Sequence, residues 1–175
     1  MSAITFIELM SPIGRLRIVT DADAGAICRL DMETHAAFAT RVAGERADTP
    51  LLRLAARQLR EYFDGARSSF ELPLRELGTA FQRQAWQALR AIPFGQTRSY
   101  AEQARAIGRP TATRAVGAAN ARNPIGIIVP CHRVIGSDGS LTGYAGGEAA
   151  KRWLLAHEAR TSNRRPSVVQ EGLRF

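Results

Sequence analysis

The 175-residue chain is poor in cysteine and aromatic residues, has one lysine and contains no long hydrophobic run. Two cysteines cannot form a disulfide framework, which excludes the class of small disulfide-stapled secreted domains. No apolar run approaches the roughly 18–20 residues that a membrane span needs, and the N-terminus lacks the basic and apolar regions of a secretory signal. The 45% of hydrophobic residues are ordinary for a globular protein. We therefore expect a soluble cytoplasmic protein that does not bind membranes.

Of the 24 basic residues, 23 are arginine and one is lysine. The charge is also uneven along the chain. Residues 1–80 carry a net charge of −1, whereas residues 81–175 carry +9. A basic half of this kind favours a polyanionic partner such as nucleic acid, although a general bias towards arginine would also raise the count.

The first third of the chain is patterned as short strands joined by tight turns. Three segments are rich in β-branched residues or alternate between polar and apolar residues, at 4–9, 15–20 and 26–30. Their short connections favour an antiparallel meander.

A helix is predicted to begin after Thr49, with Pro50 at its first position and Gly65 placed to end it. Residues 66–78 lack periodicity and are expected to connect two domains.

The second half has mainly helical signals. It predicts helices that begin near Thr79, Tyr100, Thr113 and Ala149. The second of these has a capping box, formed by Ser99 and Glu102, and the third would be capped by Thr111 or Thr113. The two short helices at 100–107 and 113–121 are joined by a glycine-containing turn, which makes them a helix-turn-helix candidate. The apolar run at 125–129 is consistent with a buried strand.

The sharpest local motif is Pro-Cys-His-Arg-Val at residues 130–134. His132, Arg133 and helix-terminal N–H groups could favour the thiolate of Cys131, which is the nucleophilic form of cysteine. Glu158 could orient the histidine. Adjacent residues of an extended chain point to opposite faces, so we expect a water between Cys131 and His132. A buried structural thiol beside a turn histidine is the competing interpretation.

Two further segments allow both a functional and a structural interpretation. Residues 111–120 are mostly small, with Arg114 as the one long cation, and such a helix could approach a DNA groove closely. The same composition suits a helix buried between its neighbours. Residues 141–147, Leu-Thr-Gly-Tyr-Ala-Gly-Gly, could wall a pocket for a flat ligand or form an ordinary surface loop.

A metal site is not predicted. The cysteines and histidines, Cys28, His35, Cys131, His132 and His157, show none of the close paired spacing that zinc sites use. We therefore expect neither a metal nor another cofactor.

Together these motifs resemble one family, the O6-alkylguanine–DNA alkyltransferases, also called methylated-DNA–protein-cysteine methyltransferases. The matching segments follow in order and cover about half the chain: 78–82, 92–100, 114–117, 123–124, 128–136, 143–147, 151–155 and Glu158. Pro-Cys-His-Arg-Val is highly specific in this context, and it favours a reactive Cys131 over a structural one. Family members with a structural zinc use first-domain ligands, for which this chain offers only Cys28 and His35.

The resemblance implies an α+β fold with two domains and a tail. Residues 1–77 would form a small antiparallel-sheet domain similar to ribonuclease H. Residues 78–160 would form a mostly helical domain with the helix-turn-helix, and residues 161–175 a flexible tail.

The resemblance also implies a single-use repair protein. It would bind alkylated double-stranded DNA in the minor groove as a monomer, flip the damaged guanine out of the duplex and move the alkyl group irreversibly to Cys131. O4-alkylthymine is a second expected substrate. Cooperative binding along DNA and the preferred size of the adduct stay open.

Roles follow from the resemblance residue by residue. Cys131 would be the nucleophile and permanent acceptor, His132 would take the thiol proton through a water, and Glu158 would hold the imidazole. Tyr100 would help to rotate the nucleotide and would protonate the leaving guanine. Asn123 would link the helix-turn-helix to the active site.

The remaining roles concern DNA and the guanine pocket. Arg114 would fill the space left by the flipped base. The DNA-facing set is Thr113, Arg114, Ala115, Gly117 and Ala118. The pocket set is Val134, Tyr144, Ala145 and Gly146, with backbone groups of Cys131, Val134 and Ala145 on the guanine edge.

Two other classes of function remain as alternatives. A damage sensor or transcription factor would use the helix-turn-helix without chemistry, and the presence of Cys131 disfavours it. A Cys–His hydrolase would need an oxyanion hole, and nothing in the sequence specifically indicates one.

Overall fold

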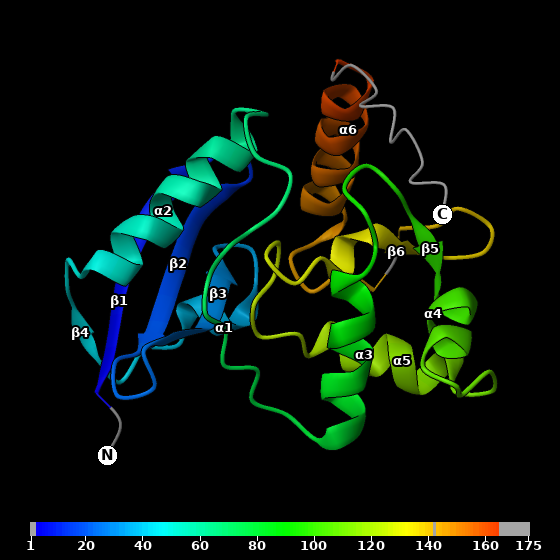
Figure 1. Cartoon of the computed structure of the whole chain (residues 1–175), viewed down its shortest axis with the longest axis horizontal. Coiled ribbons are helices and arrows are strands. Elements are labelled where there is room, and N and C mark those ends of the chain that lie inside the picture. Colours follow the sequence, from blue (N-terminus) through cyan, green and yellow to red (C-terminus); the bar gives the residue numbers. More distant parts are fainter. Residues whose placement is uncertain (1–2, 142, 165–175) are drawn as a thin grey trace, which may run out of the picture.

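Three consecutive strands build the first domain of the computed structural model, which describes residues 3–141 and 143–164. They are β1 (Ile4–Ser11), β2 (Gly14–Asp21) and β3 (Ala26–Met32). Each strand pairs antiparallel with the next, which confirms the predicted meander. A short β4 (Glu45–Arg46) adds to β1 in parallel, so the sheet has the order β3-β2-β1-β4 (Figure 1). The sequence did not predict this fourth strand.

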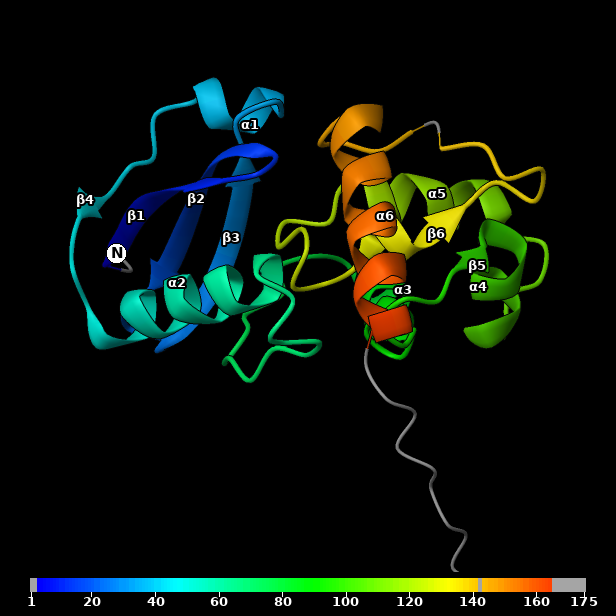
Figure 2. The same cartoon turned by 90° about the horizontal axis from the view of Figure 1, so that it is seen from above.

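Two helices complete the first domain, the short α1 (Ala36–Ala39) and the longer α2 (Pro50–Phe63). Helix α2 begins as expected, because the Thr49 side chain accepts a hydrogen bond from the backbone N–H of Leu52 and Pro50 occupies the first turn. Its buried face covers one side of the sheet (Figure 2). After α2 the chain turns at Gly65, whose φ of +78° suits glycine.

Residues 66–78 connect the two domains without a helix or named strand, as predicted. The connector still pairs with the sheet, because Ile27 exchanges backbone hydrogen bonds of 2.8 Å with Pro73 and Arg75. The second domain then folds mainly as four α-helices: α3 (Ala80–Arg90), α4 (Tyr100–Ala106), α5 (Thr113–Ala121) and α6 (Glu148–Arg164). Two short strands, β5 (Arg98–Ser99) and β6 (Val134–Ile135), pair in parallel.

Helices α4 and α5 form the predicted helix-turn-helix, and buried amides fix their packing. Gln103 and Asn120 exchange two side-chain hydrogen bonds of 3.0 and 2.7 Å, and Gln103 also donates to the carbonyl of Ala85 on α3. Trp86 of α3 donates its indole N–H to the carbonyl of Ala119. Satisfied buried polar groups of this kind specify one arrangement of the three helices.

The local caps were predicted only in part. The Ser99–Glu102 capping box is present at α4. Helix α5 starts without a side-chain cap, and its N-cap residue is Ala112, so the predicted threonine cap is wrong.

The predicted strand at 125–129 is also wrong. Only Ile125 makes a bridge, to Leu30 of β3, and the following residues form turns. Ile127 has a φ of +69°, which an extended strand does not contain and which a β-branched residue rarely adopts. This bent segment is fully buried and leads directly to Cys131.

Helix α6 extends to Arg164, beyond residue 160 where the sequence predicts a tail. The rest of that predicted tail, 165–175, lies outside the described residues.

One hydrophobic core runs through both domains. It joins residues of the sheet and α2, such as Leu16 and Leu59, to residues of the second domain, such as Trp86, Ile125 and Leu154. Figure 2 shows α6 at the boundary between the two halves. Along the described chain, no helix is long and apolar enough to cross a membrane.

Candidate active site

Cys131 opens a 3₁₀ turn, Cys131–Arg133, directly after the bent segment 125–129. Its side chain is buried, and its Sγ accepts a hydrogen bond of 3.2 Å from Nδ2 of Asn123. The same Asn123 amide donates to the carbonyl of Val129 at 2.7 Å and accepts from the N–H of Ile125 at 3.0 Å. Asn123 follows α5 by two residues, so its hydrogen bond to Sγ joins the end of the helix-turn-helix to the thiol.

The resting thiol is not an activated thiolate. Burial raises the pKa of Cys131, and this outweighs the opposing effects of the Asn123 hydrogen bond and the Lys151 charge. Backbone N–H groups of Cys131 and His132 favour the thiolate, as the sequence suggests for N–H groups, but their effect is smaller than that of burial. A base must remove the proton when the thiol reacts.

His132 provides a neutral imidazole beside this thiol in sequence. The 3₁₀ turn directs its ring to α6, where Nε2 lies 2.8 Å from Oε1 of Glu158. Burial lowers the pKa of His132, although the Glu158 hydrogen bond and charge oppose that shift. Because Glu158 accepts, Nε2 carries the proton and Nδ1 is left as the basic nitrogen. Nδ1 is buried and has no hydrogen-bond partner among the described residues.

Glu158 accepts hydrogen bonds from three other segments of the chain. Besides His132, its carboxylate accepts from Nε and Nη2 of Arg133 at 2.9 and 3.0 Å and from the N–H of Gly95 at 3.0 Å. Tyr62 of α2 donates its hydroxyl at 2.8 Å. Burial would raise the pKa of Glu158, but the hydrogen bonds and charges of His132 and Arg133 hold that pKa far below its usual value. The carboxylate is therefore ionised throughout the physiological range.

Two members of this cluster have different roles from those the sequence suggested. Arg133 does not support the thiol; it binds Glu158 and donates to the carbonyl of Ile92 at 2.6 Å. Tyr62 lies in the helix predicted after Thr49 and was given no role there, and a buried tyrosine hydroxyl needs a partner. That rule is the one signal that could have pointed from Tyr62 to a polar site.

Lys151, the one lysine of the chain, is also buried beside this site. It donates to the carbonyl of Val134, and its ammonium lies 5.8 Å from the ring centres of both Tyr100 and Tyr144. Burial lowers the pKa of Lys151, and the negative charge that Cys131 can carry opposes this shift. The pKa of Tyr100 is raised by burial and by the same charge. These shifts connect Tyr100, Lys151 and Cys131 electrostatically.

A cavity of about 210 Å³ leads to Cys131. The structure brings five predicted residues to its wall: Asn123, Cys131, Tyr144, Ala145 and Gly146. It does not bring Val134 or Tyr100 into that wall. Val134 is buried in β6 with its carbonyl bonded to Lys151.

Six of the sixteen residues that line the cavity come from the first domain, where the sequence shows no recognised motif. The first domain contributes Arg29, Leu30, Asp31, Met32, His35 and Ala37. The sequence gave no sign of this contribution, because the end of β3 has the pattern of a core strand. The cavity therefore lies at the junction of the two domains, a common position for ligand sites.

Helix α5 presents the predicted DNA-facing residues on one side. Thr113, Arg114, Ala115 and Ala118 are exposed, and Gly117 is half-buried. A Cβ on Gly117 would lie 3.8 Å from the Tyr100 ring, so α5 packs closely over α4 at that point. The end of the helix, at Asn120 and Ala121, lines the cavity. An object bound along α5 therefore lies next to the cavity.

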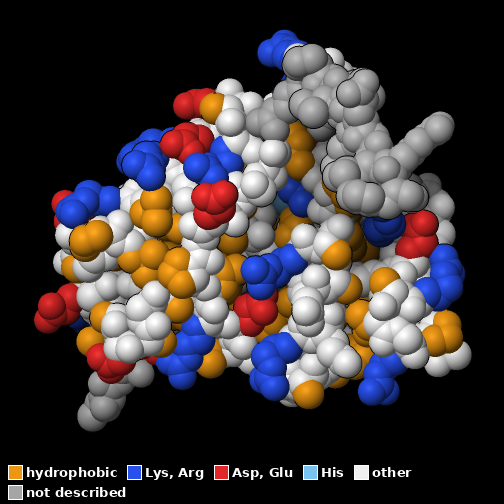
Figure 3. All heavy atoms as spheres, in the orientation of Figure 1, with side chains coloured by type: hydrophobic (Ala, Val, Ile, Leu, Met, Phe, Trp, Pro, Cys, Tyr) orange, Lys and Arg blue, Asp and Glu red, His pale blue; other side chains and the backbone are white. Residues whose placement is uncertain are grey.

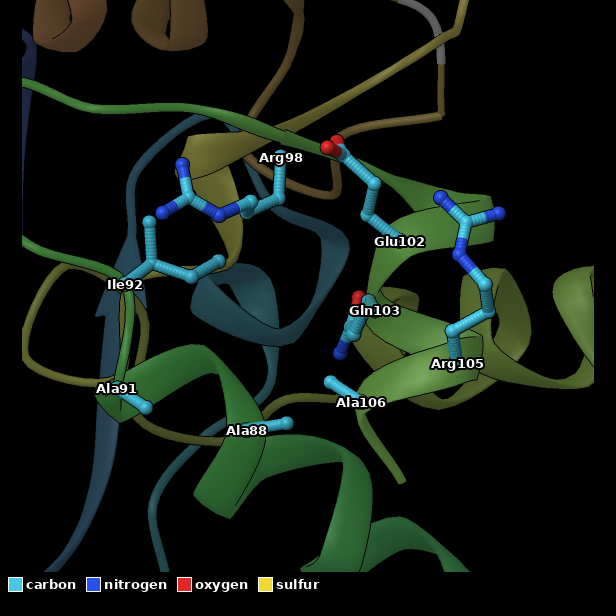
Figure 4. Close-up of a pocket in the computed structure, with 8 residues that line it drawn as sticks. All are labelled: Ala88, Ala91, Ile92, Arg98, Glu102, Gln103, Arg105 and Ala106. Carbon is cyan, nitrogen blue, oxygen red and sulfur yellow. The ribbon is translucent and has the colours of Figure 1, made fainter. Parts of the chain in front are cut away.

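The surface charge follows the uneven sequence. On the face shown in Figure 3, acidic side chains are mixed with basic ones over the first domain, on the left, and basic ones predominate over the second. A larger hollow of about 520 Å³ lies between α3 and α4 and is lined by Ala88, Ile92, Arg98, Gln103 and Arg105, among others (Figure 4). Its lining does not include Cys131, His132 or Glu158, so this hollow is separate from the candidate site.

Known proteins provide the decisive comparison. The chain is 46% identical over 153 residues to the constitutive methylated-DNA–protein-cysteine methyltransferase of Bacillus subtilis strain 168, which covers 87% of this chain and 93% of that protein. It is 60% identical over 106 residues to the methylated-DNA–protein-cysteine methyltransferase of Methanosarcina barkeri, covering 61% of this chain and 67% of that protein. The chain belongs to the methylated-DNA–protein-cysteine methyltransferases, a family of DNA-repair transferases.

The family assignment covers both domains. The pattern of the 6-O-methylguanine DNA methyltransferase ribonuclease-like domain matches residues 4–75, and that of the DNA binding domain matches residues 80–160. The predicted α+β fold, with a ribonuclease-like sheet domain and a helical DNA-binding domain, is confirmed.

Solved structures of the family have the same fold. The structure of Mycobacterium tuberculosis OGT in complex with DNA has a TM-score of 0.81 at 43% identity, covering 90% of this chain and 94% of that one. The O6-methylguanine-DNA methyltransferase of the hyperthermophile Pyrococcus kodakaraensis has a TM-score of 0.60 at 23% identity, covering 89% and 98%, and supports the fold alone.

Proposed function

We propose that this chain repairs duplex DNA by moving the alkyl group of O6-alkylguanine to Sγ of its own Cys131. One observation carries the proposal: a buried thiol held by Asn123 borders a cavity, and that cavity adjoins a helix with an exposed, small-residue face. The M. tuberculosis relative, which was solved in complex with DNA, supports a DNA partner.

The encounter with DNA begins at α5. Thr113, Ala115 and Ala118 are small enough for the helix to enter a minor groove, and Arg114 reaches out from the same exposed face. The damaged nucleotide rotates out of the duplex into the cavity, and Arg114 takes the space that the base leaves. The lesion then lies beside Ala145 and Gly146, with its O6 substituent towards Cys131.

Chemistry proceeds by displacement at the alkyl carbon. A bond forms between Sγ of Cys131 and that carbon, and the bond from the carbon to guanine O6 breaks. The thiol proton moves to Nδ1 of His132, and we expect one water to carry it across the gap between the two side chains. Tyr100, whose raised pKa keeps it protonated, donates a proton to the guanine. The proton on His132 then returns through water to the Tyr100 phenolate, so the net change is a thioether on the protein and an unmodified guanine.

The buried carboxylate explains why the histidine is a suitable base. Glu158 stays ionised and fixes the proton on Nε2, so Nδ1 is always the nitrogen that accepts. When the imidazole becomes a cation, the same carboxylate stabilises it. Proton transfer from a thiol with a raised pKa therefore takes place without prior ionisation of the thiol.

The transfer is stoichiometric and irreversible, because the mechanism offers no step that cleaves a thioether. Each molecule therefore removes one alkyl group. We extend the proposal to O4-alkylthymine, which also carries its alkyl group on an exocyclic oxygen, and to action as a monomer in the cytoplasm.

Mass spectrometry of intact protein after incubation with a duplex containing one O6-methylguanine tests the proposal. We expect one added methyl group per chain, located on the peptide that contains Cys131. Cys131→Ser should abolish the addition, whereas Cys28→Ser, a matched change at the other buried thiol, should leave it unchanged. Lesion binding without added mass would instead indicate a damage sensor, and repeated turnover would indicate a different reaction.

A further inference from the structure

The first domain supplies two buried apolar side chains to the cavity lining, those of Leu30 and Met32, of which Met32 is the unbranched one. This residue ends β3 and is 6% exposed. The other buried residues of the lining are Leu30, Asp31, Asn120, Gly126, Cys131 and Gly146. Cys131 reacts, Asn120 is bonded to Gln103, and two of the others are glycines without a side chain.

The thioether of Met32 occupies the space that these two glycines leave open. A Cβ on Gly126 would lie 2.8 Å from Cε of Met32, and a Cβ on Gly146 would lie 2.5 Å from its Sδ. Both distances are shorter than van der Waals contact. The Tyr144 hydroxyl lies 3.9 Å from the same sulfur. Met32 therefore fills the cavity floor between the bent segment before Cys131 and the glycine-rich loop.

The backbone on either side of Met32 is fixed. The neighbouring Thr34 donates its hydroxyl to the carbonyl of Gly146 at 2.6 Å. Leu30 donates its backbone N–H to the carbonyl of Pro124 at 2.9 Å. These bonds hold the backbone at the end of β3 against both segments of the second domain, whereas the unbranched side chain of Met32 can change rotamer.

A larger alkyl group must displace one of these walls. At about 210 Å³ the cavity is below the roughly 300 Å³ at which small-molecule sites usually begin. Moving either glycine would break backbone hydrogen bonds, whereas a methionine is unbranched and adopts other rotamers easily. Met32 is the wall that can withdraw.

From this geometry we infer that Met32 determines the largest alkyl group that the site accepts. The inference rests on the proposed function, and it adds a specificity residue from the ribonuclease-like domain. A methyl group fits with Met32 in its present position, and a bulky group such as benzyl requires its thioether to move aside. The identity of residue 32 should thus change the preference between adducts more than the rate for methyl.

The test compares two duplexes that differ only in carrying O6-methylguanine or O6-benzylguanine. The second-order rate constant of transfer to Cys131 is measured by mass spectrometry for each, and the benzyl-to-methyl ratio is the readout. Met32→Ala should raise this ratio at least about tenfold, the usual effect of changing the volume of an apolar pocket by a methylene or more. Met32→Leu, of similar volume but branched and stiffer, should lower it severalfold.

The matched control is Ile18→Ala, a buried change on β2 in the same core whose residue does not line the cavity. It should slow both transfers equally, if at all, and leave the ratio unchanged. Equal ratios in the wild type, Met32→Ala and Met32→Leu would overturn the inference while methyl transfer to Cys131 still stands. Absence of methyl transfer in the wild type would instead overturn the proposed function. If Met32→Ala does not fold, Met32→Leu still decides the matter.

Discussion

The two cysteines of this chain are buried to almost the same extent, with 6% of Cys28 and 7% of Cys131 exposed. Burial is also the main cause that raises the pKa of each thiol. Cys28 lies on β3, where its Sγ is 3.5 Å from the carbonyl of Val19 and its neighbours are apolar. Cys131 has an amide donor, a cavity and an adjacent imidazole with a free basic nitrogen. Neither burial nor the direction of the pKa shift distinguishes the cysteine that we propose to react; its surroundings do.

The largest expected effect comes from removing the base. His132→Gln should slow alkyl transfer by about 10²–10⁴-fold, the usual contribution of a general base. Without Nδ1 as an acceptor, the buried thiol of Cys131 has no base to take its proton, as is the case for Cys28. Single-turnover rates on methylated duplex DNA measure this effect. A rate near that of the wild type would mean that another group takes the proton.

Glu158→Gln should reduce both rate and stability. The amide cannot balance the buried Arg133, and breaking a buried ion pair typically costs about 3–5 kcal/mol. Urea unfolding at neutral pH measures the loss. Since the pKa of Glu158 is depressed in the folded state, its stabilising effect is complete above its unfolded pKa of about 4.3 and is lost as the pH falls further. The stability difference between wild type and variant should therefore shrink below about pH 4.

Arg114→Ala should affect base flipping in duplex DNA but not alkyl transfer to Cys131. We expect the rate of methyl transfer from methylated duplex DNA to fall about tenfold, because one contact that stabilises the flipped-out nucleotide is removed. Transfer from free O6-benzylguanine should change little, since that substrate needs no flipping. Equal losses on both substrates would contradict the base-replacement role.

Tyr62→Phe should have a smaller effect. It removes one hydroxyl from Glu158 and keeps the ring, which packs against Phe63, Phe70 and Phe94. Losing a hydrogen bond to a charged group should cost about 1.5–3 kcal/mol of unfolding free energy. His132 keeps its carboxylate partner, so transfer should slow only severalfold. Paired unfolding and single-turnover measurements check this; a collapse of the rate at unchanged stability would be inconsistent with it.

The smallest effect is expected at the other thiol. Cys28→Ser should leave the transfer rate unchanged and lower stability by about 1–3 kcal/mol, because a hydroxyl is more costly to bury than a thiol. A change in the methyl-transfer rate would show that the two thiols are not independent.

The structural features that depend on a few neighbouring residues were predictable from the sequence. The three-strand meander, the proline at the start of α2 and the Ser99–Glu102 capping box depend on a few neighbouring residues, and all are present. The bent segment at 125–129 was wrongly predicted as a strand, since its apolar residues suit any buried backbone. Its turns are held by the side chain of Asn123, which bonds Ile125 and Val129, and by the bridge of Ile125 to Leu30 of β3, a tertiary contact that the sequence does not show.

The candidate site was predictable only on the side of the second domain, where motifs carry it. In the sequence, Tyr62 and Met32 have the pattern of core residues. The periodicity of a helix or strand shows which side chains are buried, but not whether they contact other apolar side chains or a ligand. The sequence could not predict that the pKa of Cys131 is raised, since the burial that raises it depends on the whole fold.

The five hydrogen bonds at Glu158 have a consequence for how variants behave in cells. They join α2, the loop at Gly95, the 3₁₀ turn and α6 at one carboxylate. A substitution there lowers the folded fraction, and quality control then lowers abundance. Screens for alkylation resistance would record such variants as inactive, although most of the deficit would be missing protein. Under the proposed single-use mechanism, the number of protein copies in the cell is itself the repair capacity.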